Sequence, residues 1–219
     1  LFKMIYWWLE RGIDGFRVDA ISHIQKQPGL PSLPNPKGEK YVSSFDYHMN
    51  VAGIEKHLHE LKEQAFDPFN IVTVGEANGV TADNALLWVA EATEHDQGGV
   101  FNMIFQFEHM KLWSEEQSNV PLDLVEFKRI LSRWQDALEG KGWNALYLEN
   151  HDQARSIDTF ADPTSRYASA TALASCYFLI KGTPFIYQGQ EIGMVNHQFT
   201  SLDEFNDVSA RNLIQKLSQ

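Results

Sequence analysis

The chain has 219 residues, of which 43% are hydrophobic and 12% aromatic, and its formal net charge is −11. This composition supplies enough apolar material for one sizeable core and excludes an intrinsically disordered chain. The acidic balance disfavours nucleic acid and anionic membranes as partners, whereas a neutral sugar would meet no such repulsion.

Helical and strand patterns alternate along the sequence. In chain order, the predicted elements are a helix over 2–11, a strand over 12–18, a helix over 54–65, a strand over 71–74, a helix over 81–89, a strand over 100–104, a helix over 122–138, a strand over 143–148, a helix over 163–180 and a strand over 182–187. Residues 28–41 contain four prolines and two glycines, which predicts an irregular loop. The alternation indicates parallel α/β architecture.

Five strand–helix units are too few to close a barrel of eight units. The chain is therefore either an open α/β sheet or roughly the second half of a barrel. The carboxylates at the predicted strand ends favour the barrel.

One cysteine, Cys176, lies in the longest apolar stretch, 172–180, which is too short to cross a bilayer. A single cysteine excludes an internal disulfide, and we expect a buried structural thiol rather than a nucleophile. No basic segment leads into an apolar one after Leu1, so no signal peptide is recognised. These features predict a cytoplasmic protein without a membrane partner.

Three carboxylates each follow a short apolar run that predicts a strand: Asp19, Glu76 and Asp152. Acids at the C-terminal ends of several parallel strands indicate the active face of a βα-barrel. Two or three such acids at one site indicate glycoside hydrolysis. Taken singly, each also fits a structural role: an ion pair at a strand end, a helix cap or an ordinary turn.

The neighbours of these acids suit the same chemistry. Arg17 precedes Asp19 by two positions, so both side chains would lie on one side of a strand, and the guanidinium would lower the pKa of Asp19 and keep it ionised. Glu76 follows an apolar strand, where a sheltered carboxyl suits a general acid. His151 could donate a hydrogen bond to a sugar hydroxyl.

Other ligand classes are disfavoured. His57 and His59 are two positions apart on a predicted helix and would face different ways, so we expect no metal site there. Residues 189–193 match a Gly-rich nucleotide-binding turn too weakly to support a nucleotide-binding domain.

Four segments resemble, in order and spacing, conserved regions of the α-amylase family, glycoside hydrolase family 13. They are 12–20, similar to the fourth-strand segment, 74–78, similar to the fifth, 150–153, similar to the seventh, and 182–194, similar to the eighth-strand segment of oligosaccharide-cleaving α-glucosidases. Residues 24–49 and 100–113 also resemble the oligo-1,6-glucosidase subfamily. The resemblance covers nearly the whole chain.

This resemblance implies a role for each carboxylate. Asp19 would be the nucleophile, Glu76 the general acid/base and Asp152 the carboxylate that stabilises the transition state. The reaction would retain the α-configuration by double displacement.

The resemblance also implies substrate-binding residues. Arg17 would hold Asp19, His151 would bind sugar hydroxyls at the non-reducing end, and Arg155 would contact substrate. Ala20, next to the nucleophile, would line the site near the scissile linkage. Relatives that prefer α-1,6 bonds often carry valine there, so Ala20 tilts the expected preference towards α-1,4 or mixed linkages.

The resemblance implies a (β/α)8 TIM barrel of which residues 1–219 form the C-terminal part, about strands 4 to 8. The first strands, the small inserted domain and the C-terminal β-domain have no counterpart here. We therefore expect the 219 residues alone to be inactive or poorly folded. No cofactor is expected, and a structural Ca²⁺ or Mg²⁺ site would lie mostly in the absent N-terminal part.

The expected function is a monomeric α-glucosidase that removes terminal α-linked glucose from short malto- or isomalto-oligosaccharides. The alternatives are a trehalose-phosphate hydrolase, a transglycosylating relative and a non-catalytic barrel. The non-catalytic barrel is disfavoured because all three acids are present.

Overall fold

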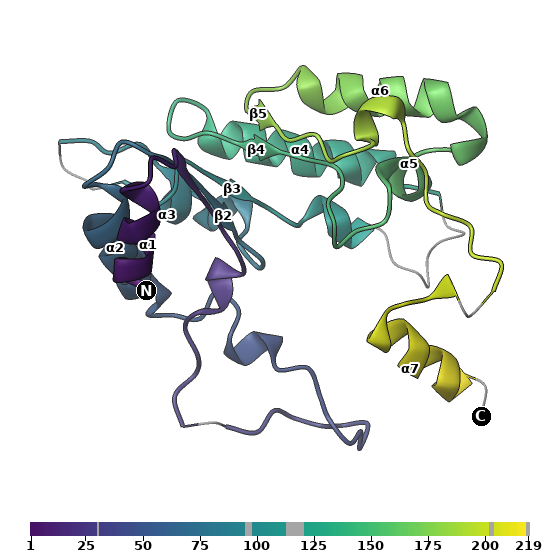
Figure 1. Cartoon of the computed structure of the whole chain (residues 1–219), viewed down its shortest axis with the longest axis horizontal. Coiled ribbons are helices and arrows are strands. Elements are labelled where there is room, and N and C mark those ends of the chain that lie inside the picture. Colours follow the sequence, from purple (N-terminus) through teal and green to yellow (C-terminus); the bar gives the residue numbers. More distant parts are fainter. Residues whose placement is uncertain (30, 95–97, 113–120, 202–203, 218–219) are drawn as a thin grey trace.

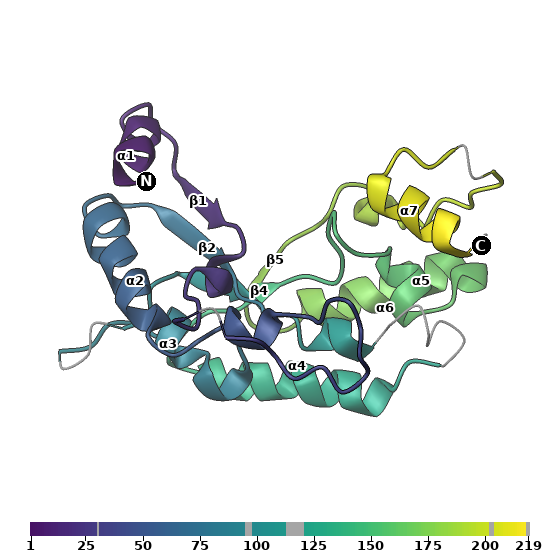
Figure 2. The same cartoon turned by 90° about the horizontal axis from the view of Figure 1, so that it is seen from below.

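The computed structural model describes residues 1–29, 31–94, 98–112, 121–201 and 204–217, and it has an α/β fold with parallel sheets. Strands β1 (Gly15–Val18), β2 (Val72–Glu76) and β3 (Met103–Phe105) form one sheet in that order, and β4 (Ala145–Leu146) pairs with β5 (Thr183–Pro184) in a second. In Figures 1 and 2, α2, α3, α4 and α6 lie along these strands, whereas α7 lies apart from them.

Seven α-helices lie in the described part of the chain. They are α1 (Phe2–Leu9), α2 (Ile54–Leu61), α3 (Leu86–Val89), α4 (Leu124–Leu138), α5 (Ser156–Phe160), α6 (Arg166–Phe178) and α7 (Val208–Leu217). All ten elements predicted from the sequence have a counterpart, with ends displaced by a few residues. Helices α5 and α7 were not predicted.

The two unpredicted helices differ in whether the sequence carries a signal for them. Helix α5 is only five residues long, which is too short to show a helical repeat. Helix α7 had a usable signal in the sequence, because an aspartate, Asp207, directly precedes it. In the structure, the side chain of Asp207 caps the helix by accepting a hydrogen bond from the backbone N–H of Ala210 at 2.7 Å.

A long loop follows β1 and returns to its own base, and the irregular stretch predicted at 28–41 lies within it. The described residues of that stretch contain no helix or strand, and Leu30 lies outside the described residues. Backbone hydrogen bonds from Gln27 to Tyr47 and from Asn50 to Ser22, both 2.8 Å long, close the base. In Figure 1, this loop and α7 lie on the side where the strands end.

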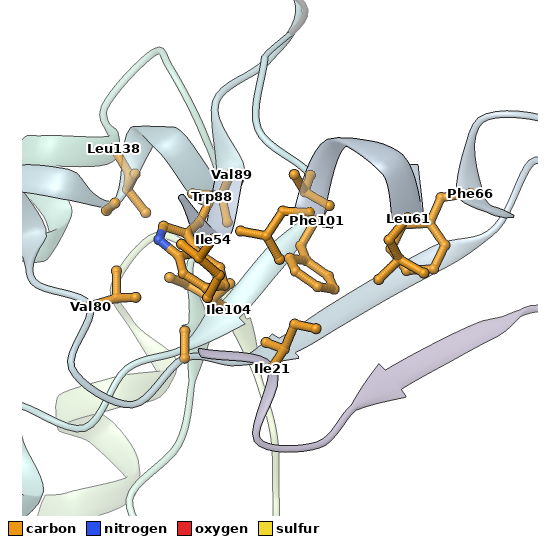
Figure 3. Packing of buried hydrophobic residues seen from close by; sticks show 14 of the residues in the cluster. Ile21, Ile54, Leu61, Phe66, Val80, Trp88, Val89, Phe101, Ile104 and Leu138 are labelled. Atoms are coloured by element: carbon orange, nitrogen blue, oxygen red, sulfur yellow. The ribbon is translucent and has the colours of Figure 1, made fainter. Parts of the chain in front are cut away.

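Buried side chains form three apolar clusters. The largest packs α1 to α4 against the first sheet and includes Ile21, Ile54, Leu61, Phe66, Val80, Trp88, Val89, Phe101, Ile104 and Leu138 (Figure 3). A second lies between α4, α5 and α6 around Phe127 and Tyr177. The third joins the two sheets through Val74 of β2, Met103 of β3 and Ala145 of β4. No described helix is long and apolar enough to cross a membrane.

Close contact between β1 and β2 depends on Gly15. A Cβ atom on Gly15 would lie 1.9 Å from the carbonyl oxygen of Val72, which is fixed backbone of the neighbouring strand. Only glycine therefore allows these two strands to pair in the observed register.

We predict that Gly15→Ala separates β1 from β2 and destabilises the protein by about 3 kcal/mol or more. Gly140→Ala is the control, because Gly140 has a φ of +65° and a Cβ atom added there would have nothing within 4 Å, so it suffers only a conformational cost of about 1 kcal/mol. Urea denaturation of the protein that contains this chain measures both. Equal losses would show that the close approach is not limiting.

His109 is fully buried against the rings of Tyr147 and Phe160, and burial lowers its pKa to about 4. Its Nδ1 lies 2.9 Å from Nε2 of Gln106, and Nε2 of His109 has no hydrogen-bond partner in the described structure. The folded protein therefore holds this imidazole in its neutral form.

We predict that His109 makes the fold acid-sensitive. Its pKa is lower in the folded state than in the unfolded state. The free energy of unfolding is therefore highest above about pH 6.5 and falls, by up to about 3 kcal/mol, as the pH drops towards 4. Denaturation midpoints of the wild type and His109→Gln, measured between pH 7 and 4.5, should converge as the pH falls. A constant difference between them would contradict this account.

Candidate active site

Arg17 brings two of the predicted carboxylates together. The register pairs Arg17 of β1 with Val74 of β2, so Arg17 and Glu76, the last residue of β2, lie on one face of the sheet. Nη2 of Arg17 lies 2.5 Å from Oε2 of Glu76, and Nη1 contacts Oδ1 of Asp19 just beyond β1. One guanidinium therefore spans both acids, as the sequence predicted for Asp19.

The two acids differ in exposure. The Asp19 side chain is 74% exposed, whereas that of Glu76 is 10% exposed. The Arg17 hydrogen bond is the main reason that the pKa of Asp19 lies below its ordinary value, followed by a hydrogen bond with Glu76, while partial burial opposes them. Asp19 is thus an open, ionised carboxylate, and Glu76 lies sheltered behind it.

Ala20 has an unusual backbone conformation. Its φ of 45° and ψ of 33° are left-handed, which is uncommon for a residue with a Cβ and costs about 1–2 kcal/mol. This turn directs the Ala20 N–H to Oε2 of Glu76, 3.3 Å away. The backbone after β1 therefore helps to hold Glu76.

His151 and Arg17 line the same small pocket. The pocket has a volume of about 200 Å³ and is lined by Arg17, Phe105, Phe107, Tyr147, Glu149, Asn150, His151, Phe185, Ile186 and Tyr187. The field of His151 also contributes to the lowered pKa of Asp19. Arg17 and His151 thus line one pocket, and the residues that line it include neither Asp19 nor Glu76.

Asp152 is less closely associated with the other two acids. Its Oδ2 lies 3.2 Å from Nε2 of His151, and its side chain is 60% exposed. In the part of the chain that the structure describes, no hydrogen bond or ion pair joins Asp152 to Asp19 or Glu76. Its convergence with them stays a prediction.

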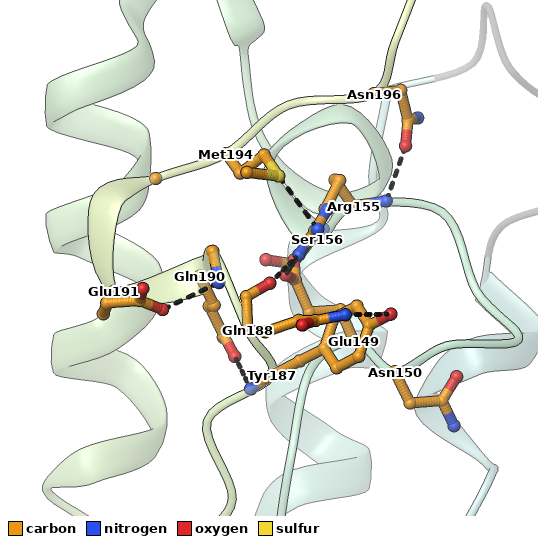
Figure 4. A network of polar contacts seen from close by, with 12 residues as sticks. Glu149, Asn150, Arg155, Ser156, Tyr187, Gln188, Gln190, Glu191, Met194 and Asn196 are labelled. Carbon is orange, nitrogen blue, oxygen red and sulfur yellow. Dashed lines mark hydrogen bonds and ion pairs between the residues drawn. The ribbon is translucent and has the colours of Figure 1, made fainter.

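Arg155 lies in a separate set of contacts (Figure 4). Its guanidinium contacts Oε1 of Glu149 at 2.8 Å and the carbonyl oxygen of Gln188 at 2.7 Å, and its side chain is 15% exposed. The structure does not bring Arg155 to Asp19 or Glu76, and its predicted contact with substrate stays a prediction.

Sequence reasoning missed the aromatic residues of the pocket. Tyr147 on the segment after β4 packs edge-on against Phe105, and Phe105 packs edge-on against Phe185. Burial, and then the charge of Glu76, raise the pKa of Tyr147 well above its usual value. An available signal was the position of these aromatic residues at or just after strand ends.

Acidic and histidine side chains also determine where a metal ion could bind. Within the described ranges, no group of three or more histidine, cysteine, aspartate or glutamate side chains is arranged to hold a metal ion. Nε2 of His57 lies 3.0 Å from Oε1 of Gln25. The expectation that the protein binds no cofactor stays a prediction.

We predict that Arg17→Met raises the pKa of Asp19 towards 3.8, because it removes the largest cause of the present lowering. Carbon-detected NMR titration of the aspartate carboxyls measures this change. Arg129→Met is a control on an exposed pair with Glu126 and should leave Asp19 unaltered. An unchanged Asp19 titration in Arg17→Met would contradict the assignment of the cause.

A family model described as the catalytic domain of α-amylase matches residues 1–219. The probable oligo-1,6-glucosidase 3 of Bacillus subtilis (strain 168) is 55% identical over 98% of this chain, and the oligo-1,6-glucosidase of Bacillus cereus is 44% identical over 99%. The chain spans 38% of the length of each of these relatives.

Solved structures of similar enzymes superpose on the chain. A mutant of the Bacillus licheniformis trehalose-6-phosphate hydrolase superposes with a TM-score of 0.83 at 29% identity, covering 99% of this chain and 38% of that one. A trehalulose synthase mutant superposes with a TM-score of 0.80 at 29% identity, covering 98% and 38%.

Proposed function

Because the chain belongs to the family of α-amylase catalytic domains, we propose that it carries the reacting carboxylates of a retaining α-glucosidase. The enzyme would hydrolyse terminal α-linked glucose from short oligosaccharides. The observation that carries this proposal is the single Arg17 guanidinium that spans Asp19 and Glu76. Two acids that share one guanidinium are close together, and close spacing is typical of retaining rather than inverting glycosidases.

The proposed reaction has two displacements. Asp19, exposed and ionised, attacks the anomeric carbon while Glu76 protonates the departing glycosidic oxygen. Water then attacks the anomeric carbon as Glu76 takes its proton, and the bond from that carbon to Asp19 breaks, which releases glucose and the free Asp19 carboxylate. Asp152 would stabilise the positive charge that develops on the sugar ring.

The remaining proposed site residues bind and orient the sugar. His151 lines the pocket and would donate to a sugar hydroxyl, and Arg17 holds Asp19 ionised. Arg155 stays a candidate for substrate contact. Ala20 lies beside both acids, where it would face the scissile linkage.

We propose that the five parallel strands are about strands 4 to 8 of a TIM barrel. The acids at their C-terminal ends support this proposal, as do large apolar residues on the surface, such as Tyr167 and Leu179, which are 84% and 83% exposed. The first strands, a small inserted domain and a C-terminal β-domain would complete the enzyme. Residues 1–219 alone would then be inactive or poorly folded.

The cellular setting is proposed on the same basis. We expect a cytoplasmic monomer with no cofactor, and any structural Ca²⁺ or Mg²⁺ site would lie mostly outside these residues. The single, partly buried Cys176 suits a reducing compartment.

The linkage preference is open to direct test. The names of the oligo-1,6-glucosidase relatives favour α-1,6 bonds, whereas the small Ala20 favours α-1,4 or mixed linkages. Parts of the two stretches that resemble the oligo-1,6-glucosidase subfamily, at Leu30 and Trp113, lie outside the described residues. Comparison of kcat/KM for maltose and isomaltose decides the preference.

A trehalose-phosphate hydrolase or a transglycosylating relative is the alternative, and the superposition on a trehalose-6-phosphate hydrolase is compatible with the first of these. Turnover of trehalose 6-phosphate at least as fast as that of isomaltose would select the first. Sugar transfer products in excess of free glucose would select the second. A non-catalytic barrel would turn over none of these substrates.

We predict that Asp19→Asn and Glu76→Gln each lower kcat/KM by at least about a hundredfold, because each removes a group that forms or breaks a bond in the reaction. Asp14→Asn is the matched control, since Asp14 is an exposed carboxylate five residues before Asp19. Release of p-nitrophenol from p-nitrophenyl α-D-glucoside measures the rates, and proton NMR of the first-formed glucose identifies the anomer.

Retention requires that the α-anomer forms first. If neither substitution reduces turnover by that factor, or if the β-anomer forms first, the proposed roles of these two carboxylates are wrong.

A further inference from the structure

Arg155 connects two chain segments that each contribute residues to the pocket lining. One of its nitrogens, Nη1, contacts both Oε1 of Glu149 and the carbonyl oxygen of Gln188, and Nη2 lies 2.9 Å from Sδ of Met194. Its Cζ lies 4.8 Å from the ring centroid of Tyr187. A single side chain thus contacts Glu149, in the segment after β4, and three residues of the loop that follows β5 (Figure 4).

Glu149 is the buried anchor of these contacts. Its side chain is 1% exposed, and its second oxygen, Oε2, accepts a hydrogen bond from the N–H of Ser156 at 2.5 Å. Both carboxylate oxygens are therefore satisfied by groups at the start of α5. Removing one member of such a buried pair leaves an uncompensated charge, whereas removing both does not.

The loop that Arg155 holds is an ordered unit. The N–H of Gln190 donates to the carbonyl of Tyr187 and that of Met194 to the carbonyl of Gly189, both at 2.9 Å. On its far side, Nη2 of Arg166 on α6 donates to the carbonyl of Ile192 at 2.8 Å. Arg166 connects this loop to α6, and Arg155 connects it to Glu149 in the segment after β4.

These two segments both supply residues of the pocket lining. Asn150 and His151 directly follow Glu149, and Tyr187 directly precedes Gln188. The relative position of His151 and Tyr187 therefore depends on the contacts made by Arg155.

We propose that the Glu149–Arg155 pair is a positioning clamp that fixes Tyr187 relative to His151 and thereby sets the affinity of the pocket for the terminal sugar. Arg155 would act through its neighbours rather than by touching the sugar. The proposal rests on the proposed function of the pocket. It assigns to Arg155 a different role from the substrate contact that the family resemblance implies.

The test is a double-mutant cycle in the full-length protein that contains this chain, with Glu149→Gln, Arg155→Met and the double variant. Because the clamp needs both partners, we expect each single change to raise KM for p-nitrophenyl α-D-glucoside by about tenfold and the double variant to raise it no further. The kcat should change by less than about threefold, since neither residue touches the reacting atoms.

The Glu108–Arg133 pair provides a matched control. Nη2 of Arg133 lies 3.0 Å from Oε2 of Glu108, whose side chain is 13% exposed, and neither side chain lines the pocket. The Glu108→Gln, Arg133→Met double variant should leave KM unchanged even where it lowers the thermal midpoint. An equal rise in KM in this control would assign the effect to general destabilisation and overturn the proposal.

Additive effects of the two single changes would show that Arg155 contacts sugar independently of Glu149, which also overturns the clamp. If the Arg155→Met variant does not fold, Arg155→Lys replaces it as the test of the clamp. It keeps the charge but loses the planar fork, so KM should still rise, and an unchanged KM would contradict the clamp. Asp19→Asn separates this outcome from failure of the proposed function, because full activity in that variant would refute the function instead.

Discussion

The contact of Arg17 with Asp19 and Glu76 is the interaction on which this site depends. It requires that β1 and β2 pair in one register, and that register depends on a glycine where the two backbones nearly touch. The left-handed turn at Ala20 completes the arrangement by aiming an N–H at Glu76. The turn at Ala20, the register of β1 with β2 and the charge of Arg17 therefore act on the same two carboxylates. A change in any one of them would disturb the position of both.

Two kinds of ion pair build the site. The Arg17 group opens to solvent on the side of Asp19, so it can meet a substrate. The Glu149–Arg155 pair is closed, because its carboxylate is buried and its guanidinium is used on protein partners. An exposed pair can carry chemistry, whereas a buried one fixes the segments around it. Arg17 and Glu149, one member of each group, both line the pocket together with His151.

The sequence predicted the alternating strands and helices and the meeting of Asp19 with Arg17. These features follow from local apolar patterns and from side-chain alternation along a strand. It did not predict the five-residue helix α5, whose first residue, Ser156, donates a hydrogen bond to the buried Glu149. Nor did it predict the partners of Arg155, because those contacts depend on how the loop after β5 folds back. The position of Asp152 relative to the other acids likewise depends on a loop.

Covalent trapping tests the central claim most directly. A 5-fluoro-α-D-glucosyl fluoride should leave a long-lived glucosyl ester on the attacking carboxylate, because fluorine slows the second displacement. Mass spectrometry of peptides from the inactivated full-length protein should locate the sugar on Asp19. A label on Glu76 or Asp152, with Asp19 unmodified, would contradict the account.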